Sequence, residues 1–257
     1  PMPLSHSIRG QVVSSAGLLE GTEFDISTDP GNGSYRREPD LAYNRSRNEY
    51  LVAWEQRDPA PGDYDIYARR VQGIGIPLFP ESFILAGGLG DELAPAVAAI
   101  ATDANQGRYL VVYEDHRIAT DVDIHIRLVS GDGVVQSIPQ EAIAASTEDE
   151  TAPAVAGNEN GRRFLVAWTR FLTDPQAPWV HWNFIYGRAM GVGGNFQGSA
   201  MQMGGMFDAD HPAVGAGAAG DFLVAFDDDP WMANDWDIYG RLWGNRVYLP
   251  GVLKRRH

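Results

Sequence analysis

The feature that most constrains this chain is an internal repeat, because a fixed period identifies a repeat architecture before any single strand is assigned. A run of an aromatic residue, Leu, Val, Ala or Val, and a second aromatic residue occurs four times, at residues 50–54, 109–113, 164–168 and 222–226. A proline precedes each run, at Pro39, Pro95, Pro153 and Pro212, with spacings of 56, 58 and 59 residues. Four units of about 57 residues therefore fill most of the chain.

A second signature follows each run. It pairs Ile with a closing Arg at residues 65–69, 123–127, 184–188 and 237–241, and reads Asp-Ile-Tyr-Gly-Arg in the last of them. Short apolar runs rich in Val and aromatic residues are typical of strands covered on both faces, and alternating segments are typical of half-buried strands. With a strand after each proline and a fourth near residues 83–85 or 142–144, each repeat predicts four antiparallel strands. Such a unit, repeated radially, is a β-propeller blade.

We therefore predict an all-β fold, a single β-propeller domain over residues 1–257 with blades of about 57 residues. A half-repeat at residues 1–37 closes the ring, and repeats follow at about 38–91, 92–150, 151–209 and 210–257. Counting strands favours four blades, and the alternative is five blades with one incomplete. The N-terminal strand at residues 8–13 is then surplus. It either competes with residues 238–243 for one place or pairs with a like molecule by edge addition.

The combined pattern of Leu-Val-Ala-Trp, an acidic loop and Asp-Ile-Tyr-Gly-Arg resembles repeats of secreted and surface-exposed bacterial proteins predicted to form β-propellers. The resemblance covers nearly the whole chain and implies a secreted or cell-surface location. It implies no particular activity, because the propeller fold carries lectins, enzymes and scaffolds. The third repeat departs from the pattern, with Thr169 in place of an acid and Phe184 in place of Asp.

Composition excludes several classes of protein. The 20 Lys and Arg against 34 Asp and Glu give a formal net charge of −14, which argues against a nucleic-acid partner. The longest apolar runs fall far short of the roughly 20 residues that cross a bilayer, so we expect no membrane insertion. Cysteine is absent, which excludes disulfides, thiolate nucleophiles and thiolate metal ligands.

Paired aspartates stand just before the Ile-Tyr-Gly-Arg segment in three repeats. In extended chain, residues two apart point the same way, so each pair could converge on a hard cation such as Ca²⁺. The candidate ligands are Asp63, Asp65, Asp121, Asp123, Asp235 and Asp237. The alternative is that these side chains cap turns and solvate loop tips.

Aromatic residues gather in the longest loops between the two signatures. A flat indole beside Asp or Asn suits the apolar face and hydroxyl groups of a sugar, which makes a glycan the leading partner. The candidate binding residues are Trp179, Trp182, Trp231, Asn234 and Trp236. The alternative is that the tryptophans pack between blades.

Charged residues also recur with the repeat. The acid after the first signature (Glu55, Glu114, Asp227) and the Arg that ends the second (Arg69, Arg127, Arg241) are expected to form architectural ion pairs within a blade. The acidic runs at residues 148–150 and 227–229 are interpreted as solvated loop charges, and no residue is assigned a catalytic role.

We therefore expect a non-catalytic secreted or surface protein that binds carbohydrate in the manner of a lectin, with Ca²⁺ as the candidate ion. One alternative is a glycoside hydrolase of propeller fold, which needs two carboxylates in a shared cleft. The other is a structural protein that forms homo-oligomers through its N-terminal strand.

Overall fold

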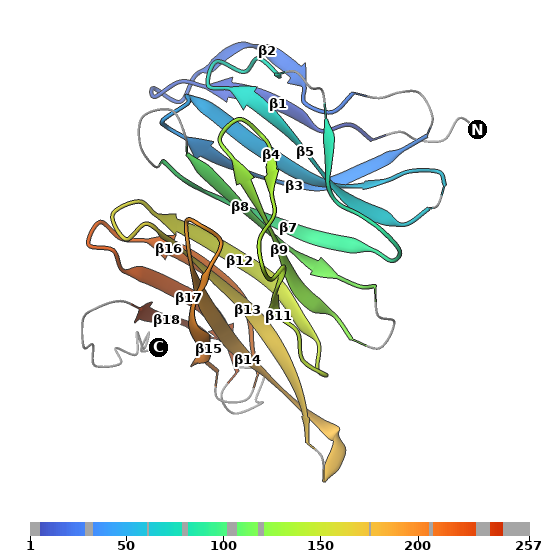
Figure 1. Ribbon diagram of the computed structural model, residues 1–257, viewed down its shortest axis with the longest axis vertical. Helices are drawn as coiled ribbons and strands as arrows, with labels where there is room; N and C mark the ends of the chain where they lie inside the picture. Colours follow the sequence, from blue (N-terminus) through green and yellow to red (C-terminus); the bar gives the residue numbers. More distant parts are fainter. Residues whose placement is uncertain are drawn as a thin grey trace.

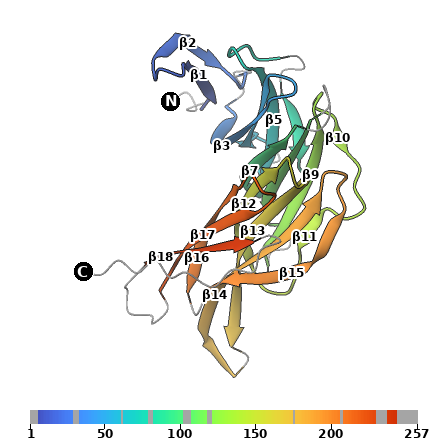
Figure 2. The same ribbon diagram turned by 90° about the vertical axis from the view of Figure 1, so that its left-hand side faces the viewer.

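The computed structural model describes residues 6–28, 33–60, 62–78, 82–101, 107–117, 121–174, 176–205, 208–229 and 237–243, with the backbone alone at 174 and 177–180. Within these ranges the chain forms strands and turns, without a helix, and so without a helix that could cross a membrane. The strands form five antiparallel sheets that stack face to face along a curved arc (Figures 1 and 2). Four-stranded antiparallel sheets repeated in this way are propeller blades.

The sheets follow the chain in order. The N-terminal sheet holds β1 (Arg9–Val13) and β2 (Leu19–Asp25). Blade 1 holds β3 (Tyr35–Asn44), β4 (Glu49–Arg57), β5 (Tyr64–Gln72) and β6 (Phe83–Ala86). Blade 2 holds β7 (Glu92–Ile100), β8 (Arg108–Asp115), β9 (Asp123–Ser130), β10 (Val135–Gln136) and β11 (Ala142–Ala144). Blade 3 holds β12 (Glu150–Asn158), β13 (Arg163–Asp174), β14 (Ala177–Gly191) and β15 (Phe196–Gly204), and blade 4 holds β16 (Ala209–Ala216), β17 (Phe222–Asp228) and β18 (Asp237–Trp243).

The predicted ring is open in this structure. Among the described strands, β1 pairs with β2, whereas β17 pairs with β16 and β18. Because β18 occupies the place beside β17, the N-terminal strands do not complete blade 4, and the two sheets lie at opposite ends of the arc (Figure 2). The competition expected for this place is thus resolved in favour of residues 237–243.

The second strand of each blade lies between two neighbouring sheets, which explains its continuous apolar sequence. In β4, Leu51 and Ala53 pack toward blade 2, whereas Val52 and Trp54 pack toward the N-terminal sheet. The same alternation in β8 and β13 builds the cores of the next two joints. The hydrophobic core is therefore divided among four joints between five sheets.

Each first strand carries a bulge at its X-Pro dipeptide. The ladder shifts register between Arg37 and Asp40 in β3 and at the matching place in β7, β12 and β16. The residue before proline has a positive φ in all four, namely Glu38 (49°), Ala94 (50°), Ala152 (51°) and His211 (48°). A non-glycine residue in this left-handed region costs roughly 1–2 kcal/mol, so surrounding contacts must hold it.

The recurring acids hold these bulges. Glu55 Oε1 accepts a hydrogen bond from Ala94 N–H, and Glu114 Oε1 accepts one from Ala152 N–H, both at 2.8 Å. Each of these acids thus binds a backbone N–H of the following blade. In blade 3, Thr169 takes the place of the acid, and its Oγ1 donates to Asp210 Oδ1 at 2.7 Å, beside His211.

The recurring arginines reach the other way, to a carbonyl on or directly after the last strand of the preceding sheet. Arg69 Nη1 donates to Ile26 O at 2.7 Å, and Arg241 Nη1 donates to Met203 O at 2.9 Å. Matching bonds run from Arg127 to Leu85 O and from Arg188 to Ile143 O. The expected ion pairs within a blade, such as Glu55 with Arg69, were therefore wrong. Glu55 instead pairs with Arg37. The recurring acids and the recurring arginines thus form hydrogen bonds that connect neighbouring sheets, and we call these bonds straps.

Candidate active site

A pocket of about 230 Å³ lies between the outer strand of blade 2 and the face of blade 3. Its aromatic wall comes from Trp168 in β13 and Tyr186 in β14, which are direct partners in the ladder. Their rings stack with centroids 6.4 Å apart, and the Arg170 guanidinium lies 5.4 Å from the centre of the Tyr186 ring. The volume is below that of drug-sized sites and suits one small ring.

The floor of the pocket is acidic. Glu150 begins β12 and its side chain is only 2% exposed. Arg170 Nη2 contacts Glu148 Oε2 at 2.7 Å, and Arg170 Nε lies 3.7 Å from Glu150 Oε1. Ser146 Oγ lies within hydrogen-bonding distance of both carboxylates. Ser146 and Arg170 therefore join Glu150, which lines the pocket, to Glu148 beside it.

The two glutamates have different protonation tendencies. Burial raises the pKa of Glu150 above its usual range. Hydrogen bonds from Arg170 and Ser146 lower the pKa of the more exposed Glu148. Two carboxyl groups whose pKa values are pushed apart are suited to separate acid and base roles.

Two buried polar atoms of this pocket lack a partner among the described residues, Trp168 Nε1 and Glu150 Oε2. Buried polar groups are usually satisfied, so each calls for an explanation. In blade 1 the same positions are closed: Trp54 Nε1 donates to Gln56 Oε1 at 3.4 Å, and Arg36 Nε donates to the same oxygen at 2.8 Å. Blade 3 thus presents a free donor and a free acceptor where blade 1 has an internal network.

A second acidic cluster lies deeper, between blades 1 and 2. Glu92 in β7 faces Asp115 in β8 across the ladder, and both are nearly fully buried. Burial and the charges of Asp115 and Asp65 raise the pKa of Glu92 to about 8. Although burial opposes it, hydrogen bonding from Arg117 lowers the pKa of Asp115. The two side chains lie between blades 1 and 2, and we assign this pair to the packing of that joint.

Among the candidate metal ligands, Asp63 interacts electrostatically with Asp65, and Asp121 with Asp123. Burial raises the pKa of Asp65, and the charge of Asp63 raises it further. Burial and the charge of Asp121 raise the pKa of Asp123 to about 6. Across the described residues, no group of three or more His, Asp or Glu is placed to hold a metal ion. Asp237 begins β18, and Asp235 lies outside the described residues, so Ca²⁺ binding stays a prediction.

The candidate sugar-binding residues are only partly described. Trp182 lies on β14, half-buried, opposite Leu172, and Trp179 lies on the same strand but its side chain is not described. Trp231, Asn234 and Trp236 fall outside the described residues.

The sequence predicted other roles for the residues of the pocket. Trp168 and Tyr186 belong to the two repeat signatures and were expected in the strands, with no ligand role. Glu150 was interpreted as a solvated loop charge, and this was wrong, because it is a buried strand residue. The sequence signal that could have pointed to this pocket is the departure of blade 3 from the repeat, because Thr169 and Phe184 flank this region.

No protein-family model and no curated protein sequence matches the chain. Solved structures do match its fold. An α-L-arabinanase from Penicillium chrysogenum complexed with arabinobiose gives a TM-score of 0.51 at 14% identity, over 84% of this chain and 69% of that chain. An α-L-arabinofuranosidase from Fusarium graminearum with an iminosugar inhibitor gives 0.51 at 13% identity, over 91% and 80%. A Hadza microbial sialidase gives 0.51 at 12% identity, over 80% and 44%.

The chain spans 64% of a thermostable family-43 glycoside hydrolase, which is similar at a TM-score of 0.46 and 12% identity. At these identities the likeness concerns the fold alone. The fold is thus β-propeller-like, and its structural neighbours include carbohydrate-active enzymes.

Proposed function

We propose that this protein is a glycoside hydrolase that holds one sugar unit in the pocket between blades 2 and 3. The observation that carries the proposal is the pair Glu148 and Glu150, joined by Ser146 and Arg170 beside an aromatic wall. Glycoside hydrolysis needs two carboxyl groups, one protonated and one ionised. The likeness of the fold to an arabinanase and an arabinofuranosidase supports a substrate that contains arabinose.

The chemistry follows from the environments of the two carboxyl groups. Glu150, kept protonated by burial, donates its proton to the oxygen of the departing group. Glu148, kept ionised by Arg170, attacks the anomeric carbon, and a water molecule deprotonated by Glu150 then displaces Glu148 and releases the sugar. Because both bond the same hydroxyl, they lie closer than the roughly 6.5–9.5 Å of inverting enzymes, which favours retention of configuration. The Trp168 N–H and the Tyr186 ring are placed to hold the sugar.

Hydrolysis of aryl α-L-arabinofuranosides by the full chain tests this proposal. We expect turnover by the native protein and a loss of roughly 100-fold or more in Glu150→Gln, because general acid catalysis contributes about that much. Glu159→Gln, on the loop at the other end of β12, is the matched control and should retain its rate. Absence of turnover, or a Glu150→Gln protein with full activity, would contradict the proposal.

The second candidate function is glycan binding without catalysis, favoured by the stacked Trp168 and Tyr186 rings. Arabinose oligosaccharides titrated into the native protein and into Tyr186→Ala separate the two functions. Binding that is lost in Tyr186→Ala, without any hydrolysis, supports the lectin-like alternative. A secreted or surface location fits either function and stays a prediction.

A further inference from the structure

The side chains around the buried glutamate differ between two joints that have the same backbone plan. Counted from the ends of β6 and β11, Gly88 and Gly90 stand in the joint between blades 1 and 2 where Ser146 and Glu148 stand in the joint between blades 2 and 3. The next strand of each joint, β7 or β12, begins with a buried glutamate. The first of these joints forms without the serine and the second carboxyl group, so packing of the sheets does not require them.

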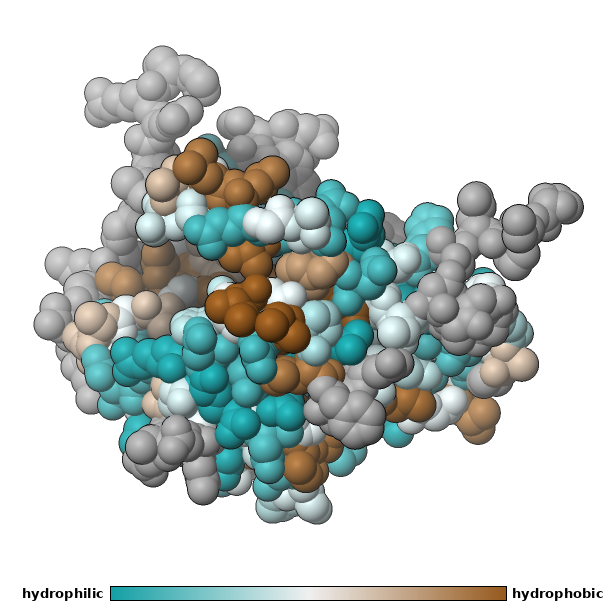
Figure 3. Space-filling view, turned by 90° about the horizontal axis from the view of Figure 1, so that it is seen from above, coloured by the Kyte–Doolittle hydropathy of each residue, from teal (hydrophilic) through white to brown (hydrophobic). Residues whose placement is uncertain are grey.

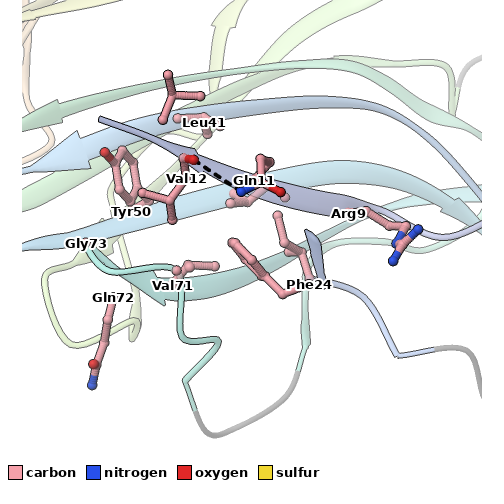
Figure 4. A pocket seen from close by; sticks show the side chains of 14 residues that line it. Arg9, Gln11, Val12, Phe24, Leu41, Tyr50, Val71, Gln72 and Gly73 are labelled. Carbon is pink, nitrogen blue, oxygen red and sulfur yellow. Dashed lines mark hydrogen bonds between the residues drawn. The ribbon is translucent and has the colours of Figure 1, made fainter. Parts of the chain in front are cut away.

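A larger pocket at the N-terminal sheet has a different chemistry. Seen from above, apolar side chains border a hollow in the surface (Figure 3). A pocket of about 500 Å³ lies at this end, between β1 and blade 1, and Figure 4 shows Phe24, Tyr50 and Val71 along it. Its described lining residues include no Asp or Glu. The carboxyl groups of the smaller pocket are thus not a general property of the hollows between sheets.

The Ser146 hydroxyl lies between two carboxyl groups but carries a single hydrogen. Its Oγ lies 2.9 Å from Glu148 Oε2 and also contacts Glu150 Oε1 at hydrogen-bonding distance. A hydroxyl donates one hydrogen bond, whereas an ionised carboxylate only accepts. With both glutamates ionised, one of the two contacts would bring two oxygen atoms together without a hydrogen between them. One of the carboxyl groups must therefore carry a proton and donate it to Ser146.

Burial decides which glutamate carries this proton. The Glu150 side chain is 2% exposed, whereas that of Glu148 is 32% exposed and accepts a hydrogen bond from Arg170 Nη2 at 2.7 Å. The charged side chains that act on Glu150 or line its pocket are Glu148, Arg170 of β13, Asp123 of β9 and Arg188 of β14. Although Arg170 favours ionisation, burial prevails and raises the pKa of Glu150. At rest, Glu150 therefore donates to Ser146, and Ser146 donates to Glu148.

We propose that Ser146 is a positioning residue that holds the proton on Glu150 and the charge on Glu148, through a hydrogen-bond chain that reverses during hydrolysis. The reversal rests on the proposed function, whereas the chain at rest does not. When Glu150 turns its proton to the departing oxygen and Glu148 bonds to the anomeric carbon, the negative charge passes to Glu150. The Ser146 hydroxyl then rotates and donates to Glu150.

The second half of the reaction restores the chain. Water gives one proton to Glu150 and its oxygen bonds to the anomeric carbon, while the electron pair of the broken bond returns to Glu148. The charge is again on Glu148, and the Ser146 hydroxyl rotates back to it. Ser146 thus keeps its own hydrogen throughout and stabilises whichever carboxyl group is charged.

The pKa values of the two glutamates in the full chain test the chain at rest without a substrate. Carbon-13 NMR of the carboxyl groups measures them, with Glu148→Gln and Glu150→Gln to assign the signals. In Ser146→Ala, ionised Glu148 loses a donor and protonated Glu150 loses an acceptor. We therefore expect the pKa of Glu148 to rise and the pKa of Glu150 to fall. Ser146→Thr keeps the hydroxyl and should restore both values, and Ser199→Ala, exposed on β15, is the control.

The opposite shift would overturn the proposal. A higher pKa of Glu150 in Ser146→Ala would mean that Ser146 donates to Glu150 at rest, and unchanged pKa values would mean that Ser146 does not join the two groups. A Ser146→Thr protein that behaves like Ser146→Ala would show that the hydroxyl is not the cause.

The pH profile of kcat/KM on aryl α-L-arabinofuranosides supplies the second readout. Its acidic limb follows the ionisation of Glu148 and its basic limb that of Glu150, so the bell should narrow from both sides in Ser146→Ala. The maximum should fall roughly 10- to 100-fold, as expected for one hydrogen bond to a charged group, and should recover in Ser146→Thr. Shifted pKa values in a protein without turnover would contradict the hydrolase and leave the chain at rest in place. Turnover that depends on Glu150, with pKa values that Ser146→Ala does not move, would contradict the role of Ser146 alone.

Discussion

At the scale of the residue, the most consequential group is Glu92, which is held with a proton between blades 1 and 2. Its pKa of about 8 lies far above the value of about 4.3 in an unfolded chain. The folded state therefore binds a proton that the unfolded state releases. The contribution of protonated Glu92 to the free energy of unfolding is complete below about pH 4. It is lost as the pH rises toward 8.

We predict that Glu92→Gln removes this dependence, since an amide keeps the shape of the side chain without its charge. The variant should be more stable than the native protein near pH 8.5, by a few kcal/mol, and should show no such gain near pH 4.5. Urea denaturation at the two pH values measures the difference. Glu20→Gln, on the exposed strand β2, is the control. An equal change at both pH values would show that titration of Glu92 is not the cause.

The sequence could not identify the special residues of the pocket. Glu148 and Glu150 stand two apart in one acidic run, yet one is exposed and the other is buried by a neighbouring blade. The distinction arises from packing between residues distant in sequence, such as Ser146 and Arg170. By contrast, the electrostatic interaction of Asp63 with Asp65 is local, because the two residues stand two apart in the sequence.

At the scale of the element, the straps between blades account for the strained bulges. We predict that Glu114→Ala lowers the free energy of unfolding by roughly 1–3 kcal/mol, because Ala152 N–H loses its acceptor. Chemical denaturation measures the loss. Glu141→Ala, which removes a half-exposed partner of Arg127, is the control and should cost less than about 1 kcal/mol. Equal costs would mean that the strap does not stabilise the joint.

The strands themselves were largely predictable, whereas the straps were not. The runs at residues 50–54 and 164–168 are apolar on both faces, and period and length identify them as strands. Between blades, Glu55 and Arg69 bind backbone atoms, which have no signature in the sequence. An ion pair between Glu55 and Arg69 was therefore inferred, whereas each residue forms a hydrogen bond to a neighbouring sheet.

At the scale of the whole molecule, the open arc leaves matching residues of different blades unequally buried. We predict that Leu165→Ala lowers the free energy of unfolding by roughly 2–5 kcal/mol, since this side chain is completely buried. The equivalent Leu223→Ala should cost less than about 1 kcal/mol when measured on dilute, monomeric protein, because its side chain is already half exposed. Thermal or urea unfolding of both variants makes the comparison. Equal losses would indicate that blade 4 is covered in solution.

The left-handed bulge has an evolutionary consequence. At the joints after blades 1 and 2 the group held is the main-chain N–H of Ala94 or Ala152, so the side chain at that site takes no part in the hydrogen bond. Its identity has drifted among Glu38, Ala94, Ala152 and His211, while the conformation is the same in all four. Copies of an ancestral module can therefore diverge at the bulged residue while the hydrogen bond between blades stays in place.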